Sequence, residues 1–458
     1  MHFAMFNESY PPQTDGVAQT TRNYAVWLNR KHGGCCVVAP QHALAAGHQY
    51  DEEFPVIRFA SMPLFLVKEY SLGLPQIAFR TSQKLSEMPI DLVHAHCPFA
   101  SGTLAMKTAV KKDVPLVATF HSKFADDFAQ RLKMENAGKI AARYTAKFFS
   151  MADEAWAVNN STAQTLRDYG YRGPITVMPN GCDFEPMART DGNRAAVLRQ
   201  FGLTDKPLLL FVGRVVEQKN IPFLLQALGQ IKAGSEFNLL VIGDGEGVGP
   251  YQKLAQELGL ADRVKFAGAI REREPLRGIY AAADLFVLPS VYDNAPLVVR
   301  EAAACGCPSA LITGTNAAEG ITNGVNGFTS ELDPAAYGQM IRGLLAHPEA
   351  IREAGDNARE TVYVSWERIV DRVAVEYRRI IAEYQDKKAS EKGLRKRYSI
   401  PAALAQEIFN KQVVRIKFTT KSLDRLAHRR TAALKAVNQQ RLEMIRGKLL
   451  KSVKRQSR

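Results

Sequence analysis

The sequence has few cysteines and no long apolar run, and each shortage excludes a class of protein. Six cysteines among 458 residues are too few for a disulfide scaffold of this size. The closest pairs, Cys35-Cys36 and Cys305-Gly306-Cys307, lack the spacing of a zinc site, so we expect small buried thiols. No apolar run approaches the roughly 18 residues that cross a bilayer, which argues against a membrane-spanning helix.

The amino terminus also lacks the features of a secretory signal. Its first residues, MHFAMFNESYPP, contain no basic segment and no long apolar core, so we expect a cytoplasmic protein. The composition, with 46% hydrophobic and 23% charged residues, is that of an ordinary globular protein. Because 458 residues exceed the usual limit for one hydrophobic core, we predict two domains and an additional segment.

The net charge of +14 is concentrated at the carboxyl end. Residues 387–458 contain 21 Lys or Arg and 4 Asp or Glu, which leaves 39 basic and 42 acidic residues for 1–386. Beyond Pro401 apolar residues recur among the basic ones, so we predict a partly helical basic tail. Basic side chains near an anionic leaflet contribute on the order of 1 kcal/mol each, which predicts reversible attachment to an anionic membrane surface.

Two other interpretations of residues 387–458 stay open. A soluble basic helix that only covers the rest of the protein has the same composition. A nucleic-acid-binding segment is also basic. The sequence, however, has no regular alternation of aromatic with basic residues, no RNA-binding signature and no zinc module, so we expect no nucleic-acid partner.

Apolar runs of strand length alternate with helical patterns along most of the chain. Such alternation predicts the α/β class, with parallel sheets covered by helices on both faces. The polar stretch from Glu185 to Lys206 interrupts the alternation, and we place a domain boundary there, near residue 186. Two doubly wound domains, 1–185 and 186–365, would face a cleft, and ligands bind beyond the carboxyl ends of such strands. The predicted strands are Cys35 to Ala39, Leu92 to His94, Leu116 to Thr119, Glu154 to Val158, Leu208 to Val212, Leu239 to Ile242, Val264 to Phe266 and Leu285 to Leu288.

The most informative stretch runs from Asp284 to Pro308. Its apolar run, Leu285 to Leu288, predicts a buried strand, and the turn-rich residues after it predict a loop. A helix is then predicted from Pro296, at the first helical position, to Ala304, with Gly306 in the left-handed conformation after it. The amides at the start of this helix predict a diphosphate site formed by Asn294, Ala295, Pro296, Leu297 and Val298.

Two acids in this stretch are eight positions apart. Asp293 would lie above the anion site, and Glu301 would lie more than two turns along the helix, where a ribose would fit. The alternative interpretation is a strand, a loop and a helix with two solvated acids, because short motifs have a high false-positive rate.

Other candidate ligands stand where predicted strands or loops end. Gly16 opens a predicted helix after a proline-rich loop, and its amide would face a phosphate. Arg214 and Lys219 follow the predicted strand Leu208 to Val212, and two cations there would hold a diphosphate leaving group. The alternative is that they pair with Glu217 on the surface.

Histidines and glycines give weaker signals. His121 follows a predicted strand and would bind a sugar hydroxyl, with Asp126 or Asp127 as its partner, although a lone histidine is more often structural. His94 and His96 are expected to alternate across a strand and so not to share a metal ion. The run Gly243 to Gly247 lacks the G-x-G-x-x-G spacing, so we expect a tight turn there instead of a dinucleotide site.

These residues form an ordered set that resembles the retaining GT-B glycosyltransferases of the group-1, family-four type. The set comprises Gly16, His121, Pro179-Asn180-Gly181, Arg214 with Lys219, and Asp293 with Glu301. The resemblance covers residues 1 to about 385. It implies the GT-B fold, in which the amino-terminal domain binds the acceptor and the carboxyl-terminal domain binds a nucleotide sugar. A last helix, 366–386 here, would cross back to the first domain.

The resemblance also implies roles for the matching residues. Arg214 and Lys219 would clamp the donor phosphates, and His121 would lie near the transferred sugar and the acceptor hydroxyl. Asp293 would contact the sugar hydroxyls and Glu301 the ribose. The family has Glu where this sequence has Asp293, and the shorter side chain bears on the choice of sugar.

The implied reaction is transfer of a hexose from a nucleoside-diphosphate sugar, taken to be a UDP sugar, to an acceptor hydroxyl with retention of configuration. No Asp-x-Asp occurs, and we expect neither a metal nor another cofactor. The segments TFHSKFADDF and SVYDNAPLVVREAAACG are most similar to the branch that glycosylates membrane lipids such as diacylglycerol, which implies a peripheral enzyme on the inner face of the cell membrane. A soluble sugar or a cell-surface glycan as acceptor stays open, as does a nucleotide-sugar epimerase on the same architecture.

Overall fold

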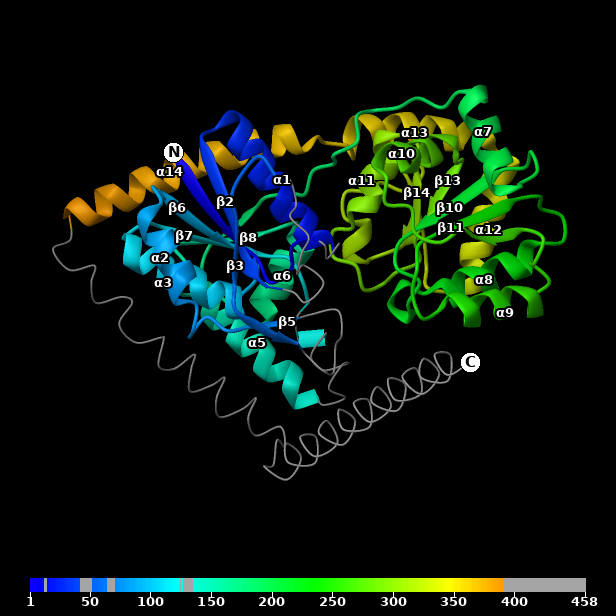
Figure 1. Cartoon of the computed structure of the whole chain (residues 1–458). Helices are drawn as coiled ribbons and strands as arrows, with labels where there is room; N and C mark the ends of the chain where they lie inside the picture. Colours follow the sequence, from blue (N-terminus) through cyan, green and yellow to red (C-terminus); the bar gives the residue numbers. More distant parts are fainter. Residues whose placement is uncertain (12–14, 42–51, 64–70, 124, 127–134, 391–458) are drawn as a thin grey trace, which may run out of the picture. The chain divides into compact units, whose positions relative to one another are not determined.

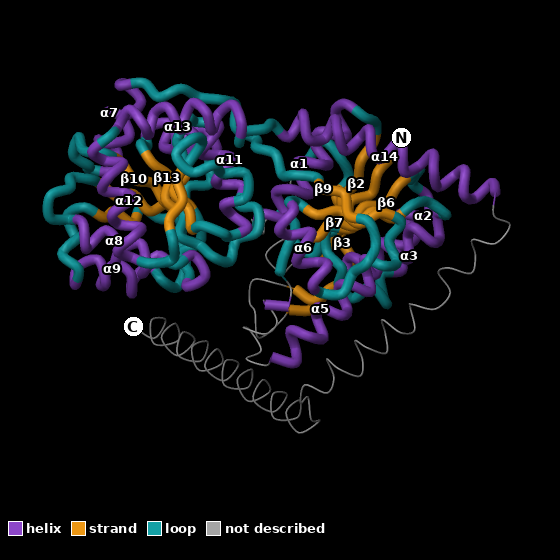
Figure 2. Tube along the Cα trace, turned by 180° about the vertical axis from the view of Figure 1, so that it is seen from behind, coloured by secondary structure: helices purple, strands orange, loops and turns teal. Residues whose placement is uncertain are grey.

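The computed structural model describes residues 1–11, 15–41, 52–63, 71–123, 125–126 and 135–390 (Figure 1). Within these residues lie two parallel β-sheets, and Figure 2 shows helices on both sides of the strands of each sheet. The predicted α/β class with two Rossmann-like sheets is confirmed. Of the predicted basic tail, 387–458, residues 391–458 lie outside the described residues.

The first sheet has seven strands, all paired in parallel. Its strand β1 pairs with two neighbours, with Ala4 opposite both Cys36 and Val93. In order across the sheet the strands are β3 (Val56–Phe59), β2 (Gly34–Pro40), β1 (His2–Phe6), β6 (Leu92–Ala95), β7 (Leu116–Phe120), β8 (Glu154–Ala157) and β9 (Ile175–Val177). The helices of this half are α1 (Gly16–Lys31), α2 (Phe79–Glu87), α3 (Ala100–Lys112), α5 (Glu135–Phe149) and α6 (Asn160–Asp168), and a separate antiparallel hairpin is formed by β4 (Ser61–Pro63) and β5 (Ser71–Gly73).

The second sheet has six strands and is also parallel throughout. In order they are β12 (Val264–Phe266), β11 (Asn238–Ile242), β10 (Leu208–Val212), β13 (Leu285–Val287), β14 (Ser309–Ile312) and β15 (Phe328–Ser330). Its helices are α7 (Asp191–Phe201), η2 (Glu217–Lys219), α8 (Ile221–Ile231), α9 (Val248–Glu257), α10 (Arg273–Ala282), α11 (Leu297–Ala304), η3 (Asn316–Ala318), α12 (Pro334–Ala346) and α13 (Pro348–Thr361).

Burial on both faces of the two sheets explains why apolar runs in the sequence predicted the strands. Every residue of β6, β7, β10, β11 and β13 is buried, so these strands have no polar face to alternate with an apolar one. The strands predicted from apolar runs are all present, with ends that differ by at most one residue. All six cysteines are buried and free, as expected.

The last described helix, α14 (Trp366–Ser390), follows the helices of the second half but packs against the first sheet. Its buried face includes Trp366, Val373 and Tyr377, which share one apolar cluster with Phe3 and Tyr24. None of the helices in the described part of the chain has both the length and the apolar character needed to cross a bilayer. The domain boundary near residue 186 stays a prediction.

A close contact between two chain segments precedes α14. The Cys182 N–H donates to the Val364 carbonyl at 2.8 Å, and the Trp366 N–H donates to the Cys182 carbonyl at 3.0 Å. A Cβ placed on Gly181 would lie 2.7 Å from the Trp366 Cα, closer than real side chains approach. Gly181 is therefore required by the packing of these segments.

We expect Gly181→Ala to lower the free energy of unfolding by about 1–3 kcal/mol, because the new methyl group must push the Trp366 backbone away. Gly192→Ala is the matched control, since a Cβ there meets nothing within 4 Å and residue 192 lies in the first turn of α7. Thermal denaturation of both variants measures the effect. Equal melting temperatures for the two variants would contradict the proposed constraint.

Candidate functional site

Two loops at the carboxyl ends of neighbouring strands bring Lys219 and Asp293 together. Strands β10 and β13 are paired, and each loop continues from one of them. The Lys219 Nζ lies 2.6 Å and 2.8 Å from the two carboxylate oxygens of Asp293. The side chains are only 16% and 18% exposed, so this ion pair is mostly shielded from solvent. Lys219 is thus paired across the loops and not with Glu217.

Hydrogen bonds hold these two loops to each other. The Ser290 hydroxyl donates to the Gln218 carbonyl at 3.1 Å and accepts from the Asp293 N–H at 3.4 Å. The Asn220 side chain donates to the Pro289 carbonyl at 3.3 Å. Asn220 has a φ of 56°, and Asn is one of the few non-glycine residues that adopt this left-handed conformation at modest cost. The ion pair therefore lies on a cross-linked pair of loops.

Arg214 lies in the same loop as Lys219, and its side chain is exposed. The glycine run after β11 packs against this loop. A Cβ on Gly243 or Gly245 would lie 1.8 Å or 2.3 Å from the carbonyl oxygens of Gly213 and Val215. Both glycines also have positive φ, so the predicted tight turn is confirmed and backbone packing accounts for these glycines.

The helix after Asp293 begins one residue later than predicted. Pro296 is the N-cap residue with an extended ψ of 125°, and α11 begins at Leu297, so placing Pro296 at the first helical position was wrong. The predicted end at Ala304 is confirmed, and Gly306 has the expected left-handed φ of 65°. The amide groups of the first turn of a helix have no acceptor within the helix, which leaves those of Leu297 and Val298 suited to an anion.

Residues that follow strands of the first sheet contact the start of this segment. The Asn294 side chain donates to the His121 carbonyl at 2.9 Å. The Asn159 and Asn180 side chains donate to the carbonyls of Asn294 and Ala295 at 2.8 Å and 3.1 Å. The structure therefore brings His121 next to the loop that contains Asp293. The side chain of Asn294 helps to position this loop through its hydrogen bond to His121.

A carboxylate also joins the two halves of the described chain. Glu319 accepts hydrogen bonds at 2.7 Å from the N–H groups of Asn160 and Ser161, at the start of α6. Burial opposes ionisation, but these hydrogen bonds prevail and hold the pKa of Glu319 below its usual range. No pattern in the sequence predicts a role for Glu319. The only signal for Asn159 is that asparagine is a common residue at a helix N-cap.

His121 is 8% exposed, and its ring contacts another histidine instead of a carboxylate. Its Nε2 lies 3.0 Å from the Nδ1 of His96, so the expected pairing with Asp126 is wrong, and Asp127 lies outside the described residues. Burial lowers the pKa of His121 to about 3, which makes the ring neutral at physiological pH.

The expectation that His94 and His96 alternate across the strand is also wrong. Residues two apart share a face, and these rings stack 4.2 Å apart.

Glu301 belongs to a different cluster from Asp293. Its carboxylate lies 2.8 Å from Arg273 and accepts a hydrogen bond from the Tyr280 hydroxyl at 3.1 Å. Arg273 also pairs with Asp183. Burial raises the pKa of Glu301, and the neighbouring Arg273 cation opposes that rise. The alternative of two solvated acids is therefore wrong for both Asp293 and Glu301.

Gly16 is exposed at the first position of α1, where the Asp15 carboxylate caps the helix by accepting from the Ala18 N–H at 2.8 Å. A Cβ on Gly16 would meet nothing within 4 Å among the described residues. Packing against the described residues therefore does not explain why this residue is glycine, whereas close approach of a ligand would.

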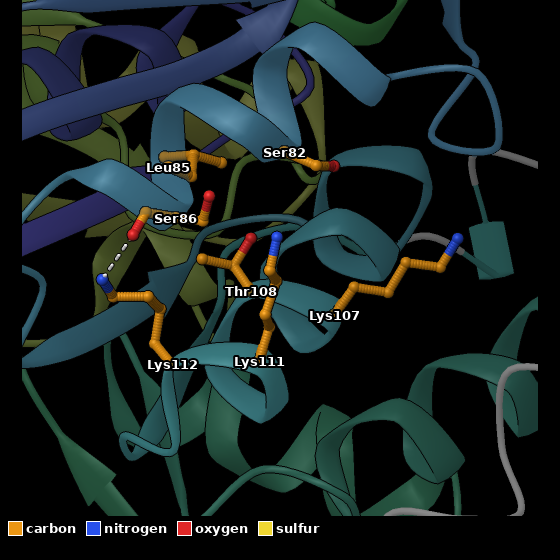
Figure 3. A pocket seen from close by; sticks show the side chains of 7 residues that line it. All are labelled: Ser82, Leu85, Ser86, Lys107, Thr108, Lys111 and Lys112. Atoms are coloured by element: carbon orange, nitrogen blue, oxygen red, sulfur yellow. Dashed lines mark hydrogen bonds between the residues drawn. The ribbon is translucent and has the colours of Figure 1, made fainter.

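A separate hollow lies between α2 and α3 (Figure 3) and contains none of the predicted site residues. Lys112 donates to the Ser86 carbonyl at 3.1 Å and to the Met88 carbonyl at 2.7 Å, so this lysine ties the end of α2 to α3. The residues that line the hollow are Ser82, Leu85, Ser86, Lys107, Thr108, Lys111 and Lys112.

Two glycosyltransferase family models match successive parts of this chain. The family model "Glycosyl transferases group 1" matches residues 194–361, and "Glycosyltransferase Family 4" matches residues 14–186. A D-inositol 3-phosphate glycosyltransferase from Mycolicibacterium smegmatis is 32% identical over 310 residues, which is 64% of this chain and 68% of the relative. An alpha-monoglucosyldiacylglycerol synthase from Streptococcus pneumoniae is 26% identical over 67% of this chain and 70% of its own length. The chain thus spans about two thirds of the length of these relatives.

Solved structures show the same fold. Anabaena HepE in complex with UDP aligns with a TM-score of 0.67 at 19% identity, covering 82% of this chain and 99% of HepE. At this identity the likeness concerns the fold alone.

We expect Arg273→Met to destabilise the protein in a pH-dependent way. Without the cation, the pKa of buried Glu301 rises further, so the native state binds this proton more tightly than the unfolded state does. The contribution of Glu301 to stability is then largest at pH values below its pKa in the unfolded state. This contribution is lost as the pH rises through the pKa of Glu301 in the folded state. Because Arg273 is 42% exposed, we expect a modest loss of about 1–3 kcal/mol at pH 8 and a smaller loss at pH 5.

Urea unfolding at the two pH values measures this difference. Arg271→Met, two residues earlier and exposed, is the control and should show no such pH dependence. An equal loss of stability at pH 5 and pH 8 for Arg273→Met would mean that Glu301 is not the group that responds.

Proposed function

Because this chain belongs to the retaining GT-B glycosyltransferases of the group-1, family-four type, we propose that it transfers a hexose from a nucleoside-diphosphate sugar to an acceptor hydroxyl. The observation that carries the proposal is the shielded Lys219–Asp293 pair, which precedes the first turn of α11. A cation, a carboxylate and helix amides in one place suit a diphosphate joined to a sugar.

In the free protein the Asp293 carboxylate occupies the position of an anion beside Lys219. The donor diphosphate would replace it, since it carries more negative charge and can also reach Arg214, the amide of Gly16 and the amides of Leu297 and Val298. Asp293 would then be free to accept hydrogen bonds from the sugar hydroxyls. Glu301, held by Arg273 and Tyr280, would bind the ribose hydroxyls with the carboxylate oxygen lone pairs that these contacts leave.

The reaction proceeds on one face of the sugar. The bond from the anomeric carbon to the diphosphate oxygen breaks, the acceptor oxygen bonds to the same face of that carbon, and the acceptor proton passes to the leaving diphosphate. Lys219 and Arg214 stabilise the charge that grows on the diphosphate, and such preorganised stabilisation is often the largest catalytic contribution. These cations supply the charge that a metal would otherwise supply, so we propose that neither a metal nor another cofactor is required.

We propose a UDP sugar as the donor and a membrane lipid such as diacylglycerol as the acceptor. HepE, which shares the fold, was solved with UDP, and one relative is named as an alpha-monoglucosyldiacylglycerol synthase. The basic residues of 387–458 would hold the enzyme at the inner face of the cell membrane. A second candidate acceptor is a soluble sugar derivative, because a more identical relative is named for D-inositol 3-phosphate. Both family models describe glycosyltransferases, which disfavours the epimerase alternative.

We expect the double substitution Arg214→Ala with Lys219→Ala to reduce turnover of the donor sugar by at least on the order of 100-fold, because both cations that face the diphosphate are lost. The rise in melting temperature caused by UDP, compared with GDP and ADP, should also disappear. Lys253→Ala is the control, since Lys253 is 78% exposed and pairs only loosely with Glu257. Unchanged turnover in the double variant would refute the proposed donor site.

We also expect the chain to require residues 391–458 for attachment to anionic vesicles that contain diacylglycerol. A variant ending at Ser390 keeps the whole of α14 and serves as the matched chain without the tail. The full chain should float with the vesicles at low salt and transfer labelled sugar to the lipid, whereas the shortened chain should lose flotation but keep its UDP-dependent thermal shift.

Two results would contradict this prediction. Label that enters inositol 3-phosphate but never the lipid would favour the soluble acceptor. Unchanged flotation of the shortened chain, combined with loss of a nucleic-acid gel shift, would assign the tail to nucleic-acid binding instead.

A further inference from the structure

Three buried histidines, His94, His96 and the candidate site residue His121, form a stacked column. The ring centroids of His94 and His96 are 4.2 Å apart, and those of His96 and His121 are 5.2 Å apart, with interplanar angles of 24° and 30°. All three residues are at most 8% exposed. Burial is the main cause that lowers the pKa of each ring, so the column is neutral at physiological pH.

The hydrogen bonds of this column are unevenly distributed. Both ring nitrogens of His94 have partners, the Thr119 hydroxyl at 2.7 Å and the Tyr377 hydroxyl of α14. His96 contacts His121 through Nδ1 at 3.0 Å, whereas its Nε2 is buried and has no hydrogen-bond partner within the described residues. His96 therefore has one satisfied nitrogen and one unsatisfied nitrogen.

This asymmetry determines where the protons lie. A neutral imidazole carries a single N–H, and only one proton fits between His96 Nδ1 and His121 Nε2. If His121 supplied that proton, His96 would carry its own on Nε2 as a buried donor without an acceptor. Buried orphan N–H groups are rarer in proteins than unsatisfied acceptors, so the arrangement with the proton on His96 Nδ1 is favoured.

We propose that His96 is a positioning residue that donates its Nδ1–H to Nε2 of His121 and thereby fixes the proton of His121 on Nδ1. His121 then presents an N–H donor, and not a lone pair, to a sugar hydroxyl. The main chain of His121 is held independently, because the Asn294 side chain donates to its carbonyl. The catalytic consequence rests on the proposed function, whereas the position of the proton does not.

The test compares two substitutions of the same residue. His96→Asn keeps an amide N–H as many bonds from the backbone as Nδ1 is, and His96→Leu fills similar space without any donor. Long-range proton–nitrogen NMR on protein labelled with 15N-histidine reports which ring nitrogen carries the proton, and His121→Ala identifies the His121 signals. We expect the Nδ1–H form of His121 in the wild type and in His96→Asn, and a shift toward the Nε2–H form in His96→Leu.

Turnover should follow the same pattern. His96→Leu should lower kcat for sugar transfer by up to on the order of 100-fold with little change in the KM of the donor, and His96→Asn should restore most of it. Tyr377→Phe is the control, since it removes a hydrogen bond from the same column without touching His121, and it should lower stability while leaving the His121 proton on Nδ1.

An Nε2–H or doubly protonated His121 in the wild type would overturn the proposal, and this measurement stands even if His96→Leu does not fold. An unchanged His121 signal in folded His96→Leu would also overturn it. If the wild-type protein transfers no sugar, the proposed function fails, but the NMR spectra still decide the role of His96.

Discussion

The ion pair between Lys219 and Asp293 is the interaction on which the candidate site depends. An exposed pair of this kind would add little to stability, but here both side chains are less than one fifth exposed, so removing either partner leaves a charge in a poorly solvated place. When another anion takes the place of the Asp293 carboxylate beside Lys219, the Lys219 charge stays paired and this cost is avoided. The pair therefore holds the Lys219 side chain in place for the proposed diphosphate, and it keeps the loop after β13 beside the loop after β10.

Neutral side-chain amides connect this loop to the first half of the chain. Asn159, Asn180 and Asn294 each make one hydrogen bond between the loop and that half, and each such bond contributes only about 0.5–1.5 kcal/mol. Contacts of this strength fix the orientation of a loop without making it costly to move. They suit a site in which a donor has to enter, react and leave, whereas a set of buried ion pairs between the halves would resist opening.

Much of the fold was predictable because strands buried on both faces are continuous apolar runs, as in Leu208–Val212. Lys219 and Asp293 were predictable one at a time, since each follows such a strand, but their pairing depends on β10 lying beside β13 and joins residues 74 positions apart. The contact of Glu319 with α6 spans 159 positions and has no local pattern. His94 and His96 were misjudged because their spacing of two, which places both rings on one face, was interpreted as alternation.

The histidine column gives the proposed reaction a property that an isolated His121 would lack. When the leaving diphosphate takes the acceptor proton, a basic imidazole beside it would compete for that proton. Burial makes His121 a poor base, and the contact with His96 occupies the lone pair on Nε2 that would otherwise accept a proton. The same ring can still donate a hydrogen bond from Nδ1. His121 is thereby suited to orient a sugar hydroxyl through the reaction without entering the proton transfer itself.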